Sequence, residues 1–382
     1  MSNYPTNSVV VDIPPARPFL LDTLAQLATH TNQAKINYQS PLEKRAKSKI
    51  ITGYFLDSLT LLHDSPLISS YQNSTECCTN LKQEDDIITG KYCNARWCIV
   101  CNRIRTAKLI RQYSEPLRIL ENKQFVTLTI PNVSGDILPE SVNKMYDAIT
   151  RIRKNLTKTY KMKMEGIRKF ECTFNPVRRD FHPHYHMILA GGKEVAENVI
   201  NLWLAQFPEA NIKGQDYRIA DDNSIIETFK YFTKLLPSQK DKTSNSKVSP
   251  YALDTIFRAM SGKRVFQSIG IKGAKEEKEE ENLELVAQKY ENVEEKITNW
   301  IWVNNDWYDS DSGEGLTNYE PSEQIKNLKK KILLPDEVGK VEPLRWREGL
   351  VGIANFKYEV NKAKPSFQLV KPVFKQLNIF NI

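Results

Sequence analysis

The sequence predicts an α+β fold in which a central antiparallel sheet is flanked by helices. Short runs of alternating apolar and polar residues predict strands, and apolar residues at helical spacing between these runs predict helices. Their order, strand–helix–strand–strand–helix–strand–helix, is typical of a sheet packed against helices. The length of 382 residues predicts at least two domains, and 40% hydrophobic residues are enough to bury a core.

The elements in the middle of the chain are the clearest. Residues 124–130 alternate as a strand does, and residues 103–120 predict a basic helix before it. Ser224 is the expected N-cap of the last helix of the pattern, with Glu227 completing a capping box. Further strands are expected at 167–174, 184–190 and 217–220, and further helices at 140–156, 193–207, 224–236 and 251–260.

Composition divides the chain into four segments. They are an N-terminal extension that is partly ordered (1–74), a cysteine-rich segment with the sheet domain (75–270), a charged linker (271–284) and a small C-terminal module of unknown role (285–382). No run approaches the ~20 apolar residues of a membrane helix. The N-terminus has no basic stretch before an apolar one, so we expect no signal peptide, no membrane partner and a cytoplasmic location.

Positive charge is concentrated in the predicted sheet domain. The chain has a net charge of +8, but residues 101–270 alone hold 28 Lys and Arg against 17 Asp and Glu. A local excess of this kind favours a phosphate-backbone partner, although a solvated basic surface has the same composition. The basic residues expected to contact DNA are Arg103, Arg105, Lys108, Arg178 and Arg179.

Three of the 5 histidines lie together at His182, His184 and His186. Residues two apart on a strand point to the same face, so His184 and His186 can chelate one divalent ion. If the preceding hairpin turns between residues 178 and 179, Glu171 pairs with His186 and completes a His–His–carboxylate site. A bulge near Pro183 would bring residue 172 to that face instead. His182 is open between a ligand, a phosphate contact and neither role.

Three polar residues share one face of the helix predicted over 224–236. At ~100° per residue, Glu227, Tyr231 and Lys234 lie together, while apolar residues occupy the opposite face. A tyrosine becomes a nucleophile only with assistance, which a base such as Glu227 or a cation such as Lys234 provides. An ordinary amphipathic helix has the same pattern.

Five of the 6 cysteines lie between residues 77 and 101. Four thiolates around Zn²⁺ would hold together a segment that has no core of its own. Which of the two adjacent cysteines, Cys77 or Cys78, would bind is not decided by the spacing. The expected zinc ligands are therefore four of Cys77, Cys78, Cys93, Cys98 and Cys101, whereas Cys172 is isolated and expected in the core.

Together these motifs resemble the rolling-circle replication initiator proteins of small bacterial plasmids, within the HUH endonuclease superfamily. The resemblance covers about residues 93–236. Residues 125–129 are similar to the first family motif, residues 184–186 to the metal-binding motif, and residues 227–234 to the motif with the nucleophile. The single tyrosine there is typical of the single-tyrosine branch. The cysteine run resembles one branch, although Ile99 stands where that branch often has proline.

The resemblance implies a ferredoxin- or RRM-like HUH domain that nicks and rejoins DNA. Mn²⁺ or Mg²⁺ on His184, His186 and Glu171 would polarise the scissile phosphate. Tyr231 would form a 5′-phosphotyrosine link and leave a 3′-OH that primes synthesis, and Glu227 stands where the family activates water for termination. The implied partner is plasmid origin DNA, single-stranded at the nick site, together with host helicase and replication proteins; the oligomeric state is not indicated.

Two rival functions remain at this point. An HUH-type transposase with two tyrosines would place a second tyrosine on the helix, and relaxases usually carry the tyrosine motif first rather than last. A non-catalytic zinc DNA-binding regulator accounts for the cysteines and the charge, but not for the pair of histidines.

Overall fold

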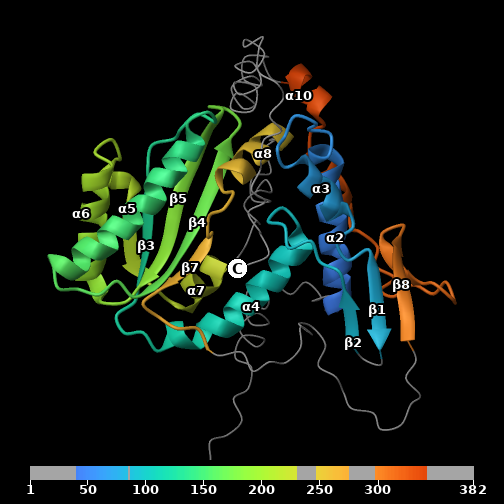
Figure 1. The fold of residues 1–382 in the computed structure, drawn as a ribbon, viewed down its shortest axis with the longest axis horizontal. Coiled ribbons are helices and arrows are strands. Elements are labelled where there is room, and N and C mark those ends of the chain that lie inside the picture. Colours follow the sequence, from blue (N-terminus) through green and yellow to red (C-terminus); the bar gives the residue numbers. More distant parts are fainter. Residues whose placement is uncertain (1–39, 85–86, 230–246, 275–296, 342–382) are drawn as a thin grey trace, which may run out of the picture. The chain divides into compact units, whose positions relative to one another are not determined.

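The computed structural model describes residues 40–84, 87–229, 247–274 and 297–341 (Figure 1). Two antiparallel sheets with flanking helices organise this part of the chain, which confirms the predicted α+β class. Within the described ranges, no helix is both long and apolar enough to cross a bilayer.

The larger sheet has five strands in the order β6-β3-β5-β4-β7, and every neighbouring pair is antiparallel. Its central strand β5 carries the three clustered histidines. The strands are β3 (Gln124–Thr129), β4 (Gly166–Asn175), β5 (Asp180–Leu189), β6 (Asp216–Ile219) and β7 (Phe266–Ile269). All of them except β7 were predicted from the sequence. The pattern does not reveal β7, because this strand is short and only partly buried.

Helices cover both faces of this sheet (Figure 1). On one face, α5 (Leu138–Lys158), α6 (Gly192–Gln206) and α8 (Pro250–Ala259) close the main core over residues such as Leu128 and Tyr185. On the other face, α4 (Ile99–Arg118) and α7 (Asp222–Phe229) pack against a smaller apolar cluster that includes Phe125, Ile167 and Ile188.

The start of α7 corrects the predicted cap. The Asp221 carboxylate, not Ser224, accepts the hydrogen bond from the third helical backbone N–H, at 2.8 Å from the nitrogen of Ser224. An aspartate immediately before the helix is as good a cap as serine, so the helix begins two residues earlier than expected. Residues 230–236 of the predicted helix lie outside the described residues.

The β4–β5 hairpin keeps the predicted face but not the predicted register. Asn175 pairs with Asp180, so the turn is centred one position earlier than expected, and Glu171 pairs with His184 rather than with His186. Because the shift of partners is two residues, Glu171 still points to the histidine face. Pro183 is tolerated within β5 because the neighbouring β3 ends at Thr129 and needs no hydrogen bond there.

The smaller sheet joins segments that are far apart in sequence. Its order is β2-β1-β8-β9, from β1 (Asn80–Glu84), β2 (Ile87–Gly90), β8 (Ile297–Val303) and β9 (Asp306–Asp309). Leu81 of the cysteine-rich segment pairs with Trp300 of the predicted C-terminal module. The predicted domain boundaries stay predictions. The remaining helices are α2 (Pro41–Leu59), α3 (Ile68–Thr75), α9 (Glu323–Lys329), α10 (Pro335–Val341) and the short η1 (Ile212–Gly214).

Contacts of Arg96 and Trp97 connect the cysteine-rich segment to α8 and to the loop that follows it, and we call these contacts the joint. The Arg96 guanidinium donates hydrogen bonds to the carbonyls of Met260 and Lys263, just after α8. The Trp97 ring lies against Tyr71, at 4.7 Å between centroids, and against Phe257 of α8, at 5.4 Å. The loop after α8 leads into β7, so this joint ends at the edge of the larger sheet.

Candidate metal centre and DNA-processing site

One face of the larger sheet changes from apolar to polar along its strands. Phe125, Ile167 and Ile188 form the apolar half under α4 and α7. On the same face, Lys169 follows Ile167 by two residues on β4, and His186 precedes Ile188 by two residues on β5. Lys169 and His186 pair with each other. The polar half therefore begins directly beside the region that α7 covers.

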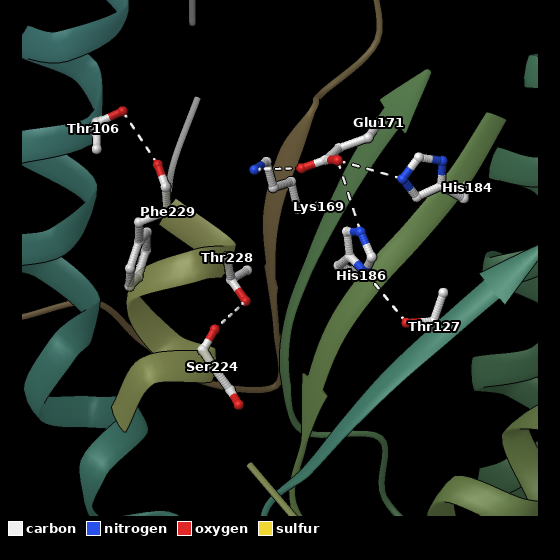
Figure 2. Close-up of polar contacts among 9 residues, drawn as sticks. All are labelled: Thr106, Thr127, Lys169, Glu171, His184, His186, Ser224, Thr228 and Phe229. Carbon is white, nitrogen blue, oxygen red and sulfur yellow. Dashed lines mark hydrogen bonds and ion pairs between the residues drawn. The ribbon is translucent and has the colours of Figure 1, made fainter. Parts of the chain in front are cut away.

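Glu171, His184 and His186 converge on this face, as Figure 2 shows. Oε2 of Glu171 lies 3.3 Å from Nε2 of His184 and 3.7 Å from Nε2 of His186. One donor atom from each side chain lies within 4.8 Å of the others. The three side chains are between 9% and 16% exposed, so the cluster is nearly enclosed but accessible.

The second nitrogen of each imidazole has its own oxygen partner. Nδ1 of His184 lies 3.0 Å from the backbone carbonyl of His182, and Nδ1 of His186 lies 3.3 Å from the Thr127 hydroxyl. A carbonyl can only accept, so Nδ1 of His184 carries a proton, and Nε2 is the nitrogen that would bind an ion. Ligating histidines are usually oriented by such outer partners.

His182 lies beside this cluster without joining it. Its ring stacks on that of His184 at 5.0 Å between centroids, and its Nδ1 lies 3.0 Å from Oδ1 of Asn132. Nδ2 of Asn132 donates to Asp180 at 2.7 Å. Burial, with His184 and Arg178 nearby, lowers the pKa of His182.

Lys169 belongs to the same cluster, and the sequence reasoning did not single it out. Its Nζ lies 2.6 Å from Oε1 of Glu171, and its side chain is only 3% exposed. The signal was available, because Lys169 is two residues from Glu171 on a predicted strand and therefore on its face.

The donors of the histidine cluster fit a divalent ion. One carboxylate oxygen and two imidazole nitrogens leave coordination positions for water or substrate oxygens, a set that suits Mn²⁺ and is compatible with Mg²⁺. A mixed set of this kind differs from the closed four-thiolate set of a structural zinc site.

The described part of α7 lies on the same face as the histidine cluster. The α4 helix holds the end of α7, where the Thr106 hydroxyl donates to the carbonyl of Phe229 at 3.3 Å (Figure 2). Tyr231 and Lys234 lie outside the described residues, and for Glu227 only the backbone is described. Their predicted roles stay predictions.

The cysteine-rich segment brings four thiols together: Cys77, Cys93, Cys98 and Cys101. Sγ of Cys101 lies 3.5 Å from that of Cys77 and 3.6 Å from that of Cys93, and Sγ of Cys98 lies 3.6 Å from that of Cys77. Ligands at about 2.3 Å from a tetrahedral zinc ion lie about 3.8 Å apart, so the four thiols fit such an ion. Cys101 is in the first turn of α4, and Cys98 is its N-cap.

Close contact makes the thiols titrate unequally. Hydrogen bonds with Cys101 and then with Cys77 lower the pKa of Cys93, whereas hydrogen bonds with Cys77 and Cys93 raise the pKa of Cys101. Cys78 is not in the cluster. Its backbone carbonyl accepts a hydrogen bond from the Trp307 indole at 2.8 Å, and its side chain is fully buried. Cys172 is buried in the main core, as expected.

The basic residues expected at DNA have different environments. Arg103 donates to the Ser48 hydroxyl at 3.1 Å and so connects α4 to α2, whereas Arg105 donates to the Asn94 carbonyl at 2.8 Å and so connects α4 to the cysteine-rich segment. Arg178 pairs with Asp180 in the exposed β4–β5 turn. Contacts of these residues with DNA, and those of Arg179 and Lys108, remain predictions.

The middle of the chain is similar to known proteins. Residues 85–198 match the family model described as "Replication protein". The matched residues include Glu171, His184 and His186, and the match supports the resemblance to replication initiators that the motifs indicated.

Curated relatives agree with the family match. A protein named "Protein rep" from Staphylococcus aureus is 32% identical over 120 residues, which are 29% of this chain and 50% of that protein. Another "Protein rep", from Bacillus amyloliquefaciens, is 27% identical over 242 residues, 52% of this chain and 69% of that protein. A third, from Streptococcus pneumoniae, is 25% identical over 174 residues, 41% of this chain and 53% of that protein. The chain thus spans about half the length of the first and third relatives. No solved structure matches it significantly.

Proposed function

We propose that the chain initiates rolling-circle replication of a plasmid by nicking one DNA strand at the origin. The observation that carries the proposal is the convergence of Glu171, His184 and His186 on the sheet face that α7 covers. The proposed nucleophile, Tyr231, follows the described end of α7 by two residues. The family match and the relatives named "Protein rep" support a role in replication.

In the proposed reaction, the Tyr231 hydroxyl attacks the scissile phosphorus. The bond between phosphorus and the 3′ oxygen breaks, the 5′ phosphate becomes linked to tyrosine, and the released 3′-OH serves as primer. A divalent ion held by Glu171, His184 and His186 would supply charge stabilisation at the phosphate oxygens. Lys234 would stabilise the negative charge on tyrosine. Glu227 would take a proton from water at termination.

The surroundings of the site favour a single-stranded substrate. The cluster is only 9–16% exposed, so an extended strand reaches it more easily than a duplex does. The exposed Arg178 in the β4–β5 turn lies close in sequence to β5 and is suited to phosphate contacts. We propose plasmid origin DNA as the partner.

The test is formation of a covalent protein–DNA adduct. Labelled single-stranded oligonucleotides that tile the replicon encoding the chain are incubated with the full chain and Mn²⁺, and the adduct is resolved on a denaturing gel. We expect an adduct with the wild type and none with Tyr231→Phe, which retains DNA binding. Tyr160→Phe, at an exposed tyrosine, is the matched control and should keep the adduct.

An undiminished adduct with Tyr231→Phe would refute the nucleophile assignment. Absence of any adduct with the wild type on every oligonucleotide, together with sequence-specific duplex binding, would favour the non-catalytic zinc regulator. That alternative gives no reason for a nearly buried Lys–Glu–His–His cluster outside the cysteine-rich segment.

A further inference from the structure

We propose that Lys169 is a positioning residue that confines Glu171 to one ligand oxygen. The inference rests on the proposed metal centre. It adds Lys169 to that centre as a residue that orients the ligand Glu171. An ammonium has no lone pair, so Lys169 in this form does not itself bind the ion.

The burial of Lys169 needs an explanation. Its side chain is 3% exposed, although a lysine is almost never buried unless it is paired. Its cross-strand neighbours are His186 on β5 and Phe266 on β7. The apolar cluster under α4 and α7 includes Phe266, so an apolar side chain at position 169 would extend that cluster without any charge to bury.

The charge has a specific partner in the cluster. Nζ of Lys169 lies 2.6 Å from Oε1 of Glu171, whereas the other oxygen, Oε2, faces the two imidazoles (Figure 2). The two oxygens of one carboxylate are thus divided between an ammonium and two histidines. A carboxylate held in this way can offer a cation one oxygen but not both.

Two consequences follow for an ion at this centre. The positive charge of Lys169 offsets the negative charge of the Glu171 carboxylate, so this carboxylate attracts an ion less strongly than it would without the ammonium beside it. A single carboxylate oxygen also neutralises less of the ion's charge than two oxygens do. The ion then keeps more of its polarising effect for a phosphate oxygen.

The proposal predicts opposite changes in metal affinity and in activity. Lys169→Met keeps the length of the side chain and removes the charge, so Oε1 of Glu171 loses its ammonium partner and both oxygens can turn to the ion. We expect Mn²⁺ to bind at least about tenfold more tightly. We expect Ca²⁺, which accepts bidentate carboxylates, to gain more than Mn²⁺. Adduct formation at saturating Mn²⁺ should fall at least about tenfold.

The experiment measures Mn²⁺ and Ca²⁺ affinity of the full, zinc-loaded chain by isothermal titration calorimetry, with adduct formation assayed in parallel. Lys169→Arg retains the charge and should stay within about threefold of the wild type in affinity. Lys163→Met removes an exposed lysine shortly before β4 and is the matched control. Thermal unfolding of each variant checks that it is folded.

A merely structural lysine would lower metal affinity and activity together when replaced. Unchanged or weaker Mn²⁺ binding by folded Lys169→Met therefore overturns the proposal. A wild type that binds Mn²⁺ no better than His184→Ala overturns the metal centre itself, and with it the proposed function. Comparison of the wild type with His184→Ala distinguishes the two failures.

Discussion

Replacing one of two adjacent cysteines should remove a metal ion, and replacing the other should not. The sequence could not choose between Cys77 and Cys78 as zinc ligands. In the structure the Cys77 thiol lies 3.5–3.6 Å from those of Cys101 and Cys98, whereas Cys78 lies outside the cluster. We therefore expect one zinc ion per chain in the wild type and in Cys78→Ser, and loss of that ion in Cys77→Ser.

The size of the effect follows from the number of thiols. Structural zinc sites contribute roughly 10–16 kcal/mol of binding free energy, and one of four ligands accounts for about a quarter, or about 2.5–4 kcal/mol. This corresponds to zinc affinity on the order of 100-fold weaker in Cys77→Ser. Cys78→Ser buries a hydroxyl in an apolar site, which lowers the free energy of unfolding by about 1–3 kcal/mol without affecting zinc.

The assay is competition with a chromophoric chelator, together with zinc content by mass spectrometry. Urea unfolding of both variants separates the loss of metal from the loss of stability. Zinc retained by Cys77→Ser but lost from Cys78→Ser would refute the assignment. Equal zinc loss in both variants would show that the pair acts as one structural element and that the thiol separations do not identify the ligand.

Three further predictions concern the joint and the histidine cluster. Trp97→Ala removes a ring packed against two aromatic neighbours and should lower the free energy of unfolding in urea by about 3 kcal/mol. Burial first, and then the charge of Asp254, raise the pKa of Tyr71, so the unfolded chain loses this proton at lower pH than the folded chain. Stability should therefore fall as pH rises above about 10, and the fall measured by urea unfolding should be smaller in Tyr71→Phe. Thr127→Val removes the hydroxyl beside Nδ1 of His186 and should weaken Mn²⁺ binding in calorimetry by about 10- to 100-fold.

Much of the larger sheet could be predicted because its patterns are local. Alternation over 124–130 and helical spacing over 140–156 depend on neighbouring residues alone, and both elements are present. The face shared by His184 and His186 also follows from strand geometry. The apolar residues between and after them, such as Tyr185 and Met187, are fully buried on the opposite face.

Features that depend on distant contacts could not be predicted in this way. The predicted register was wrong because the turn lies between Asn175 and Asp180, and its last residue, Arg179, has a positive φ of 60° that a non-glycine residue rarely adopts. The burial of Lys169 depends on its pairing with Glu171 and on β7, a strand too short to recognise. Similarly, α2 lies within the predicted extension, because its polar residues predict exposure, whereas residues such as Lys49 are buried by later segments.

The pairing of β1 with β8 has a consequence for synthesis of the protein. Leu81 leaves the ribosome long before Trp300, its partner in the smaller sheet, has been made. During translation the nascent cysteine-rich segment therefore lacks its central neighbouring strand, although all four clustered cysteines are already present. Early capture of a metal ion would hold this segment together until the last strands arrive. Metal supply during translation would then influence the yield of correctly folded chains.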